Sequence, residues 1–205
     1  MGISERKERE KSELRELILL KAKEILSKEG QDQLSIRKIA TAAEYSPATI
    51  YLYFKDKDEI LFSLMEMGFT LMGKFLMEAI SEPDPVKRIA AIGRGYVRFG
   101  IDNPDWYELM FNSEKPMNHL ERCKEVWGQG LSLFELLVST CQEVIESKRT
   151  KADNPHIMAL QLWSNVHGLV SLVQSQRLDI IEQAHPDHLV AATLDHIMNC
   201  IFIHE

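Results

Sequence analysis

The sequence predicts an all-α protein of about nine helices, with an N-terminal three-helix head joined to a larger helical bundle. Apolar residues recur at spacings of three and four along most of the chain, which is the period of a helix with one buried face. Breaks that contain Pro separate these stretches. Within residues 35–57, two short helices and a tight turn follow one another, which is typical of a helix-turn-helix.

The composition is that of an ordinary globular protein. Of 205 residues, 45% are hydrophobic and 27% are charged, so the chain can bury a large core. The three cysteines, at 123, 141 and 200, lack a C-x-x-C spacing, which argues against a disulfide framework and against a zinc site. The charged N-terminus has no apolar h-region and no stretch approaches 18 apolar residues. We therefore expect no export and no membrane span, and we expect the protein in the cytoplasm.

The net charge of -7 is unevenly distributed. Residues 1–60 contain twelve basic and twelve acidic side chains, so the whole deficit lies in residues 61–205. Affinity for DNA depends on the lysines and arginines near the phosphates and not on the total charge. The charge is therefore compatible with a DNA-binding head, although it does not by itself favour one.

A first helix is predicted from Ser4 to Glu29, where Gly30 ends it. Its inner stripe consists of Leu14, Ile18, Ala22 and Ile25. Ser35 then caps a second helix, whose buried positions are Ile36, Ile39, Ala40 and Ala43.

A third, short helix begins at Ser46 and Pro47 and is expected to run to about Phe54. Ser46 is its N-cap, and Pro47 takes the first helical position, where the missing N–H is not needed. Ile50 and Phe54 lie four residues apart and face inward. The outer side chains of this helix are therefore small, hydroxylated or basic.

Such a surface suits a helix that enters the major groove of DNA. Small side chains permit close approach, hydroxyls reach phosphates or base edges, and lysines meet phosphates. The alternative is a helical hairpin of a larger bundle, in which the aromatic residues only fill the core. Arg37, Thr49 and Lys57 distinguish the two interpretations, since Ile50 and Phe54 are core residues in both.

The run from Thr49 to Lys57, TIYLYFKDK, preceded by Ile39-Ala40, resembles the DNA-binding signature of the TetR family of bacterial transcriptional regulators. The resemblance covers about the first 60 residues. By position, it implies that one set of residues approaches base edges or sugar-phosphate, namely Arg37, Pro47, Ala48, Thr49 and Tyr51. It implies that a second set holds phosphates, namely Ser35, Tyr53, Lys55 and Lys57.

Two residues depart from the family pattern. Glu44 stands where the family usually has Gly, and a non-Gly residue in a left-handed turn costs roughly 1–2 kcal/mol. Its carboxylate also lies near the expected position of the DNA. Ala48 stands where Gly is frequent, which changes the fit against the groove in detail.

Four basic residues near the start of the first helix have two interpretations. They are Arg6, Lys7, Arg9 and Lys11. They form either an arm that reaches phosphates or a minor groove, or a solvated helix face. The interspersed Glu5, Glu8 and Glu10 favour the solvated face.

From Asp58 a long amphipathic helix is predicted to about Ser81, where Pro83 and Pro85 end it. Its apolar stripe consists of Phe62, Met65, Phe69, Met72 and Leu76. Because it begins within one turn of the helix-turn-helix, we expect it to couple the second part of the chain to the head. Much of the stripe is also ordinary core.

Three further helices are expected at residues 85–103, 105–111 and about 118–147, separated by polar or Pro-containing breaks. The family resemblance implies a small, largely apolar effector in a cavity of this region. Its expected wall residues are Phe99, Trp106, Tyr107, Met110, Phe111, Trp127, Trp163 and His167. A histidine such as His167 is more often packed and hydrogen-bonded than in contact with a ligand.

The last two helices, at about residues 155–176 and 186–202, are apolar over wide arcs. Such faces must be covered, and pairing with the same helices of a second copy would cover them in a homodimer. Residues 163–168, WSNVHG, resemble the Trp-His-Gly signature of one C-terminal domain type of the same family.

The sequence shows no constellation for catalysis, metal binding or a cofactor. Glu182 and His185 have the i, i+3 spacing of a di-metal helix, but such sites need two copies and further carboxylates. His185 and His188 could bind a metal as a pair, but the sequence favours a solvated turn at these residues. The cysteines lack a nucleophile signature and no Gly-rich phosphate loop is present. We therefore expect neither an enzyme nor a cofactor.

Together these features predict a DNA-binding transcriptional regulator, with a head at residues 1–57 and an effector-binding and dimerisation domain at residues 58–205. A two-fold dimer places its recognition helices roughly 34–36 Å apart, or a multiple of that, so the double-stranded operator should be nearly palindromic. The sequence fits repression and activation alike, and we take a repressor released by its effector as the working prediction. The alternative of another class is a helical carrier of hydrophobic molecules, and an enzyme is a poorer one.

Overall fold

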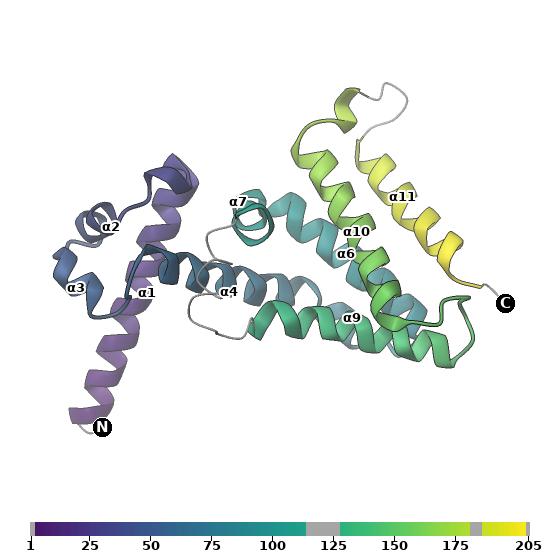
Figure 1. The fold of residues 1–205 in the computed structure, drawn as a ribbon, viewed down its shortest axis with the longest axis horizontal. Coiled ribbons are helices and arrows are strands. Elements are labelled where there is room, and N and C mark those ends of the chain that lie inside the picture. The colour runs from purple at the N-terminus through teal and green to yellow at the C-terminus, as the bar shows by residue number, and fades with distance from the viewer. Residues whose placement is uncertain (1–2, 114–127, 181–185, 204–205) are drawn as a thin grey trace. The chain divides into compact units, whose positions relative to one another are not determined.

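A computed structural model of the protein describes residues 3–113, 128–180 and 186–203, and every regular element in these ranges is a helix (Figure 1). The chain forms two compact units. Of the described residues, the first unit holds 3–67 and 108–113, and the second holds 68–107, 128–180 and 186–203. The expected all-α class is confirmed, and helix α4 (Lys57–Phe75) carries the chain from the first unit into the second.

The first unit is built on α1 (Ile3–Glu29), α2 (Ile36–Ala42) and α3 (Pro47–Tyr51), with a short 3-10 turn η1 (Gln31–Gln33). Gly30 ends α1 with a φ of 81°, as its position predicted. The core of this unit contains Ile18, Leu19, Ala22, Leu34, Ile39, Ala40, Ile50 and Phe54. Arg15 covers one edge of this core. Its guanidinium lies 4.8 Å from the centroid of the Phe54 ring and donates to Ser63 Oγ at 3.0 Å.

The starts of α2 and α3 follow from their caps. Ser35 Oγ accepts from the backbone N–H of Lys38 at 3.3 Å, and Ser46 Oγ accepts from that of Thr49 at 3.1 Å. Helix α3 ends at Tyr51, earlier than predicted, because the backbone tightens there: the N–H of residue 52 bonds to the carbonyl of Thr49.

The turn between α2 and α3 contains Glu44 in the left-handed region, with a φ of 63°. Its N–H bonds to the carbonyl of Thr41 at 3.2 Å, and the next N–H, of Tyr45, bonds to that of Ala40 at 2.9 Å. The position therefore needs the conformation that Gly adopts most easily, although this chain has Glu there.

The second unit packs α6 (Pro85–Asp102) against α9 (Gly128–Glu146), α10 (Pro155–Gln174) and α11 (Pro186–Ile201). Two short helices complete it, α5 (Met77–Ile80) and α7 (Pro104–Tyr107). The apolar core around α6, α9 and α10 includes Ile89, Ile92, Leu137, Cys141, Val144, Met158, Ala159 and Leu162. Beyond α10, a 3-10 turn η3 (Leu178–Ile180) follows.

Two expected helices differ from the structure. The stretch 58–81 breaks at Leu76, where α6 crosses so closely that a Cβ on Gly95 would lie 2.5 Å from the carbonyl oxygen of Phe75. The stretch 105–111 forms α7 and then a wider π-helical turn, η2 (Glu108–Asn112), which belongs to the first unit. Of the long helix expected from 118, the structure describes the part from Gly128.

Asp84 anchors the start of α6. Its Oδ1 accepts from the backbone N–H groups of Val86 and Lys87 at 2.9 and 3.0 Å, and its Oδ2 accepts from Arg149 Nη1 at 2.8 Å. These bonds stabilise the carboxylate, so the pKa of Asp84 lies below its usual value. The backbone N–H of Ile203 bonds to the carbonyl of Arg149 at 2.8 Å, which ties the end of α11 to the same connection.

Candidate DNA interface and effector cavity

The surface of α3 presents the side chains that the sequence placed outward. Tyr51 is 57% exposed, and Pro47 and Ala48 are exposed at the start of the helix. Thr49 is half-buried and its hydroxyl lies 2.9 Å from that of Ser46. The face therefore combines a phenol with small side chains, which permits close approach of another molecule.

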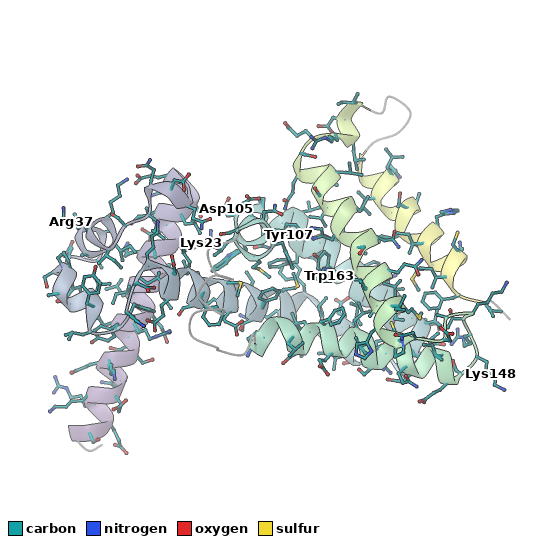
Figure 2. All side chains as sticks on the ribbon, in the orientation of Figure 1. Lys23, Arg37, Asp105, Tyr107, Lys148 and Trp163 are labelled. Atoms are coloured by element: carbon teal, nitrogen blue, oxygen red, sulfur yellow. The ribbon has the colours of Figure 1, made fainter. Side chains whose placement is uncertain are left out.

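Basic residues border this face. Arg37 is exposed on α2 and points away from the first unit (Figure 2), and Lys55 is exposed beyond α3. Ser35, Tyr53 and Lys57 are half-buried. Lys38, in contrast, is held by Glu29, with 2.6 Å between Nζ and Oε2.

The second unit holds a small apolar cavity of about 60 Å³ among α6, α9, α10 and α11. Ile92, Trp163, Val166 and Met198 are among its walls. The cavity has few polar groups, as small-molecule sites usually do. It is smaller than pockets for drug-sized ligands, which measure roughly 300–1,000 Å³.

Tyr96 and Trp163, from the cavity wall, belong to a network of four side chains. Trp163 Nε1 donates to Tyr96 Oη at 3.1 Å, and Tyr96 Oη lies 3.0 Å from Tyr107 Oη. Nδ1 of His167 lies 2.5 Å from Tyr107 Oη and 3.1 Å from Tyr96 Oη. Figure 2 shows Tyr107 and Trp163 within the second unit.

Burial sets the protonation of this network. It lowers the pKa of His167, so the imidazole is neutral at pH 7 and its Nδ1 accepts from a tyrosine hydroxyl. The shortest distance favours Tyr107 as that donor. Burial raises the pKa of Tyr96 to about 12 and that of Tyr107 further, so both phenols stay protonated.

Two family models match the chain. Residues 18–64 match the bacterial regulatory proteins of the tetR family, and residues 89–197, more than half of the chain, match the tetracyclin repressor-like C-terminal domain. The chain belongs to the TetR family. This TetR-family protein is a DNA-binding transcriptional regulator, and the family resemblance of the sequence is confirmed.

Several relatives of this TetR-family regulator are known. An uncharacterized HTH-type transcriptional regulator of Haemophilus influenzae is 29% identical over 125 residues, which are 60% of this chain and 67% of that one. The fatty acid metabolism regulator protein of Bacillus subtilis is 42% identical over 55 residues, 27% of each chain. The structure of a protein with unknown function from Rhodococcus sp. RHA1 has a TM-score of 0.74 and 25% identity, covering 92% of this chain and 95% of that one.

The described residues among the eight expected effector residues have different surroundings in this TetR-family chain. Trp163 lines the cavity, and Tyr107 and His167 join it through the hydrogen-bond network. Phe99 is fully buried and packs edge-on against Phe75, with 5.5 Å between the ring centroids. Trp106 is half-buried, Met110 and Phe111 belong to the first unit, and Trp127 lies outside the described residues.

Sequence reasoning missed Tyr96, which joins the cavity wall to the network. Tyr96 is buried on α6, three residues before Phe99. A phenol on an otherwise apolar stripe was the available signal, since a buried hydroxyl needs a hydrogen-bond partner.

The cysteines and the other residues considered for catalysis or metal binding in this TetR-family chain are placed as follows. Cys141 lies in the core, where burial raises the pKa of its thiol to about 12, and Cys200 is exposed on α11. Cys123, Glu182 and His185 lie outside the described residues. Among the residues that the structure describes, no three metal-ligating side chains cluster, and no helix is both long and apolar enough to cross a bilayer.

Proposed function

We propose that this TetR-family regulator is a cytoplasmic repressor that leaves a near-palindromic operator when a small, largely apolar effector enters the second unit. The proposal rests on the presence of two features in one chain. Helix α3 exposes the phenol of Tyr51 beside small side chains, and the second unit contains an apolar cavity. The chain acts by binding and not by catalysis, with residues 1–57 as the head and 58–205 as the effector-binding and dimerisation domain.

In this proposal the head reads DNA through α3. Arg37 and Tyr51 reach base edges, while Pro47, Ala48 and Thr49 allow α3 to sit close to the groove. The surrounding hydroxyls and lysines hold phosphates, namely Ser35, Tyr53, Lys55 and Lys57. The exposure of Arg37, Tyr51 and Lys55 supports these roles, because a side chain must be free of the core to reach the nucleic acid.

We propose that two copies pair through α10 and α11. On α10, Ile157 is 67% exposed and Leu160 is 53% exposed, and Leu172 is exposed further along the helix. Ser164 and Gly168 lie between them on the exposed face, and such small residues let a second helix approach closely. A face of this kind on a monomer supports a homodimer.

The effector in this proposal is apolar and enlarges the cavity. A space of about 60 Å³ is well below the roughly 300 Å³ of small-molecule pockets, so an occupant must displace wall side chains such as Trp163 or Met198. The name of the Bacillus subtilis relative makes fatty acids and their derivatives the first compounds to test.

When an effector displaces side chains of the cavity wall, the effect can pass along the chain to the first unit. Trp163 and Tyr96 are hydrogen-bonded to the network that contains Tyr107, and the chain passes from Tyr107 directly into Glu108 of the first unit. We propose that effector binding rearranges this network and thereby favours a conformation that no longer fits DNA. A shift from mostly bound to mostly free requires a preference of about 5 kcal/mol.

The test begins with DNA that contains the upstream region of the gene for this protein. Fluorescence anisotropy should show specific binding that weakens with salt, and Arg37→Ala or Tyr51→Phe should weaken it by about 1–3 kcal/mol. Addition of fatty acids or acyl derivatives should release the DNA. A protein that binds such ligands but no DNA would be a carrier, and unchanged affinity in both variants would remove these residues from the interface.

A further inference from the structure

We infer that α1 extends the DNA interface beyond α3, with Lys7 and Lys11 bound to phosphates that flank each half-site. The inference rests on the DNA binding of the head described above. It separates the four basic residues near the start of the chain into two pairs with different roles, and it predicts a footprint longer than the recognition helix alone would give.

The two arginines of this segment are already engaged. Arg6 Nε lies 2.7 Å from Glu10 Oε1, and Arg9 Nε lies 3.5 Å from Glu13 Oε1. Both pairs have the i, i+4 spacing at which helix side chains meet. Their charges are balanced within α1, so neither arginine depends on an external anion.

The two lysines are in the opposite situation. Lys7 and Lys11 are exposed, and within the described part of the chain neither has a hydrogen-bond or ion-pair partner. They stand four residues apart on one face of α1, where like charges repel each other by a few tenths of a kcal/mol. An external anion would relieve this repulsion.

A groove connects the lysines with the DNA-reading elements of the same unit. It measures about 600 Å³ and is lined by Lys7, Lys11 and Leu14 of α1, by Tyr45 of the turn and by Tyr53, which follows α3. Tyr45 is 44% exposed. The carboxylates of the groove are Glu10 and Glu13, and these are the groups that hold the two arginines.

The geometry of α1 sets how far this contact reaches. The N-terminal part of α1 projects beyond α2 and α3 (Figure 1), and the seven residue steps from Leu14 back to Lys7 span about 10 Å of helix. This length corresponds to about three base-pair steps of B-DNA at 3.4 Å. Phosphates outside the bases read by α3 are therefore the anions that fit the lysines.

The experiment compares two double variants of the full-length protein on two duplexes. Lys7→Ala/Lys11→Ala removes the proposed contacts, and Arg6→Ala/Arg9→Ala is the matched control, because it removes the same charge from the same turns. One duplex ends at the operator, and the other carries about four further base pairs on each side. Circular dichroism checks that both variants keep the helical content of the wild type.

The lysine variant should bind the long duplex more weakly with a flatter salt dependence. A contact with a slope of about 0.9 contributes about fivefold in affinity at about 0.15 M salt. A dimer loses two contacts on each of its two heads, so the expected loss is about 1,000-fold and the slope falls by about 3.6. On the short duplex it should match the wild type, and the arginine variant should stay within about twofold on both.

Equal losses in the two variants would indicate a general charge effect and overturn the inference. An unchanged lysine variant on the long duplex would do the same while leaving the DNA-binding function intact. If the wild-type protein binds neither duplex at any salt concentration, the proposed operator binding itself fails, and this outcome is distinct from the other two.

Discussion

A single residue, Glu44, places the clearest local strain in the DNA-binding head. Its φ of 63° is a conformation that costs a non-Gly residue roughly 1–2 kcal/mol. Glu44→Gly should therefore raise the melting temperature by about 2–4 °C, and it should also tighten operator binding by removing a carboxylate from the turn. Calorimetry and fluorescence anisotropy measure the two effects.

Glu44→Ala separates strain from charge at this position. Alanine loses the carboxylate and keeps the left-handed strain, so it should improve DNA binding without the gain in melting temperature. A Gly variant that melts no higher than the Ala variant would show that the turn is not strained by its side chain.

His167 gives the second unit a pH dependence of its own. Burial holds its pKa below 6.5, so the unfolded chain binds the proton more readily than the folded one. Stability is complete above the unfolded pKa and falls as the pH drops through about 6.5 toward the folded value. The melting temperature should accordingly decrease between pH 7.5 and pH 5.5.

Substitution of His167 tests whether this residue is the source of the pH dependence. His167→Gln keeps an acceptor near Tyr107 and cannot titrate in this range, so its melting temperature should vary less with pH. His156→Gln, at an exposed position at the start of α10, serves as the control and should retain the wild-type slope. Equal slopes in the two variants would contradict the assignment.

At the scale of the helix, Asp84 stabilises the start of α6 as an N-cap with a lowered pKa. Asp84→Ala should lower the free energy of unfolding by about 1–2 kcal/mol at pH 7, as measured by urea denaturation. Asn is as good an N-cap, so Asp84→Asn should lose less.

The same pair of variants isolates the charge of Asp84. Because the folded pKa is lowered, its stabilising effect is present above the unfolded pKa of 3.8 and is lost as the pH falls below it. The Asn variant should therefore lose less stability than the wild type between pH 5 and about pH 3. An identical acid profile would mean that the charge of the Asp84 carboxylate, toward the N–H of Lys87 and toward Arg149, contributes nothing measurable to stability.

Helix starts were predictable from the sequence, and several helix ends were not. The side chains of Ser35, Ser46 and Asp84 accept hydrogen bonds from backbone N–H groups two or three residues further on. Their capping roles are therefore local and can be predicted from the sequence. The break at Leu76 is different, since it accompanies the close crossing of α6 at Gly95, a contact between segments distant in the sequence. A local pattern contains no signal for such a crossing.

At the scale of the whole molecule, the exposed face of α3 was predictable because its residues lie within one continuous stretch. The cavity was not, because its walls come from four helices distributed over more than a hundred residues. Of the aromatic residues expected in such a site, Phe99 is buried in the core and Trp163 lines this space. Density of aromatic residues in a sequence does not distinguish a wall from a core.

Dimerisation is the prediction that belongs to this scale. Leu160→Glu places a charge on the exposed apolar face of α10, so it should weaken self-association by about 30-fold or more and weaken operator binding with it. Sedimentation equilibrium measures the association. Leu131→Glu, at a residue 42% exposed on α9, is the control and should remain dimeric. A wild type that is monomeric at micromolar concentration would contradict the proposed pairing.

The indole of Trp163 stands at the cavity and donates its N–H to a neighbouring phenol. An incoming molecule changes the polarity around this chromophore, so the protein carries its own optical reporter of occupancy. Emission spectra recorded against a library of compounds can thus test for the proposed effector without any knowledge of the genes under control.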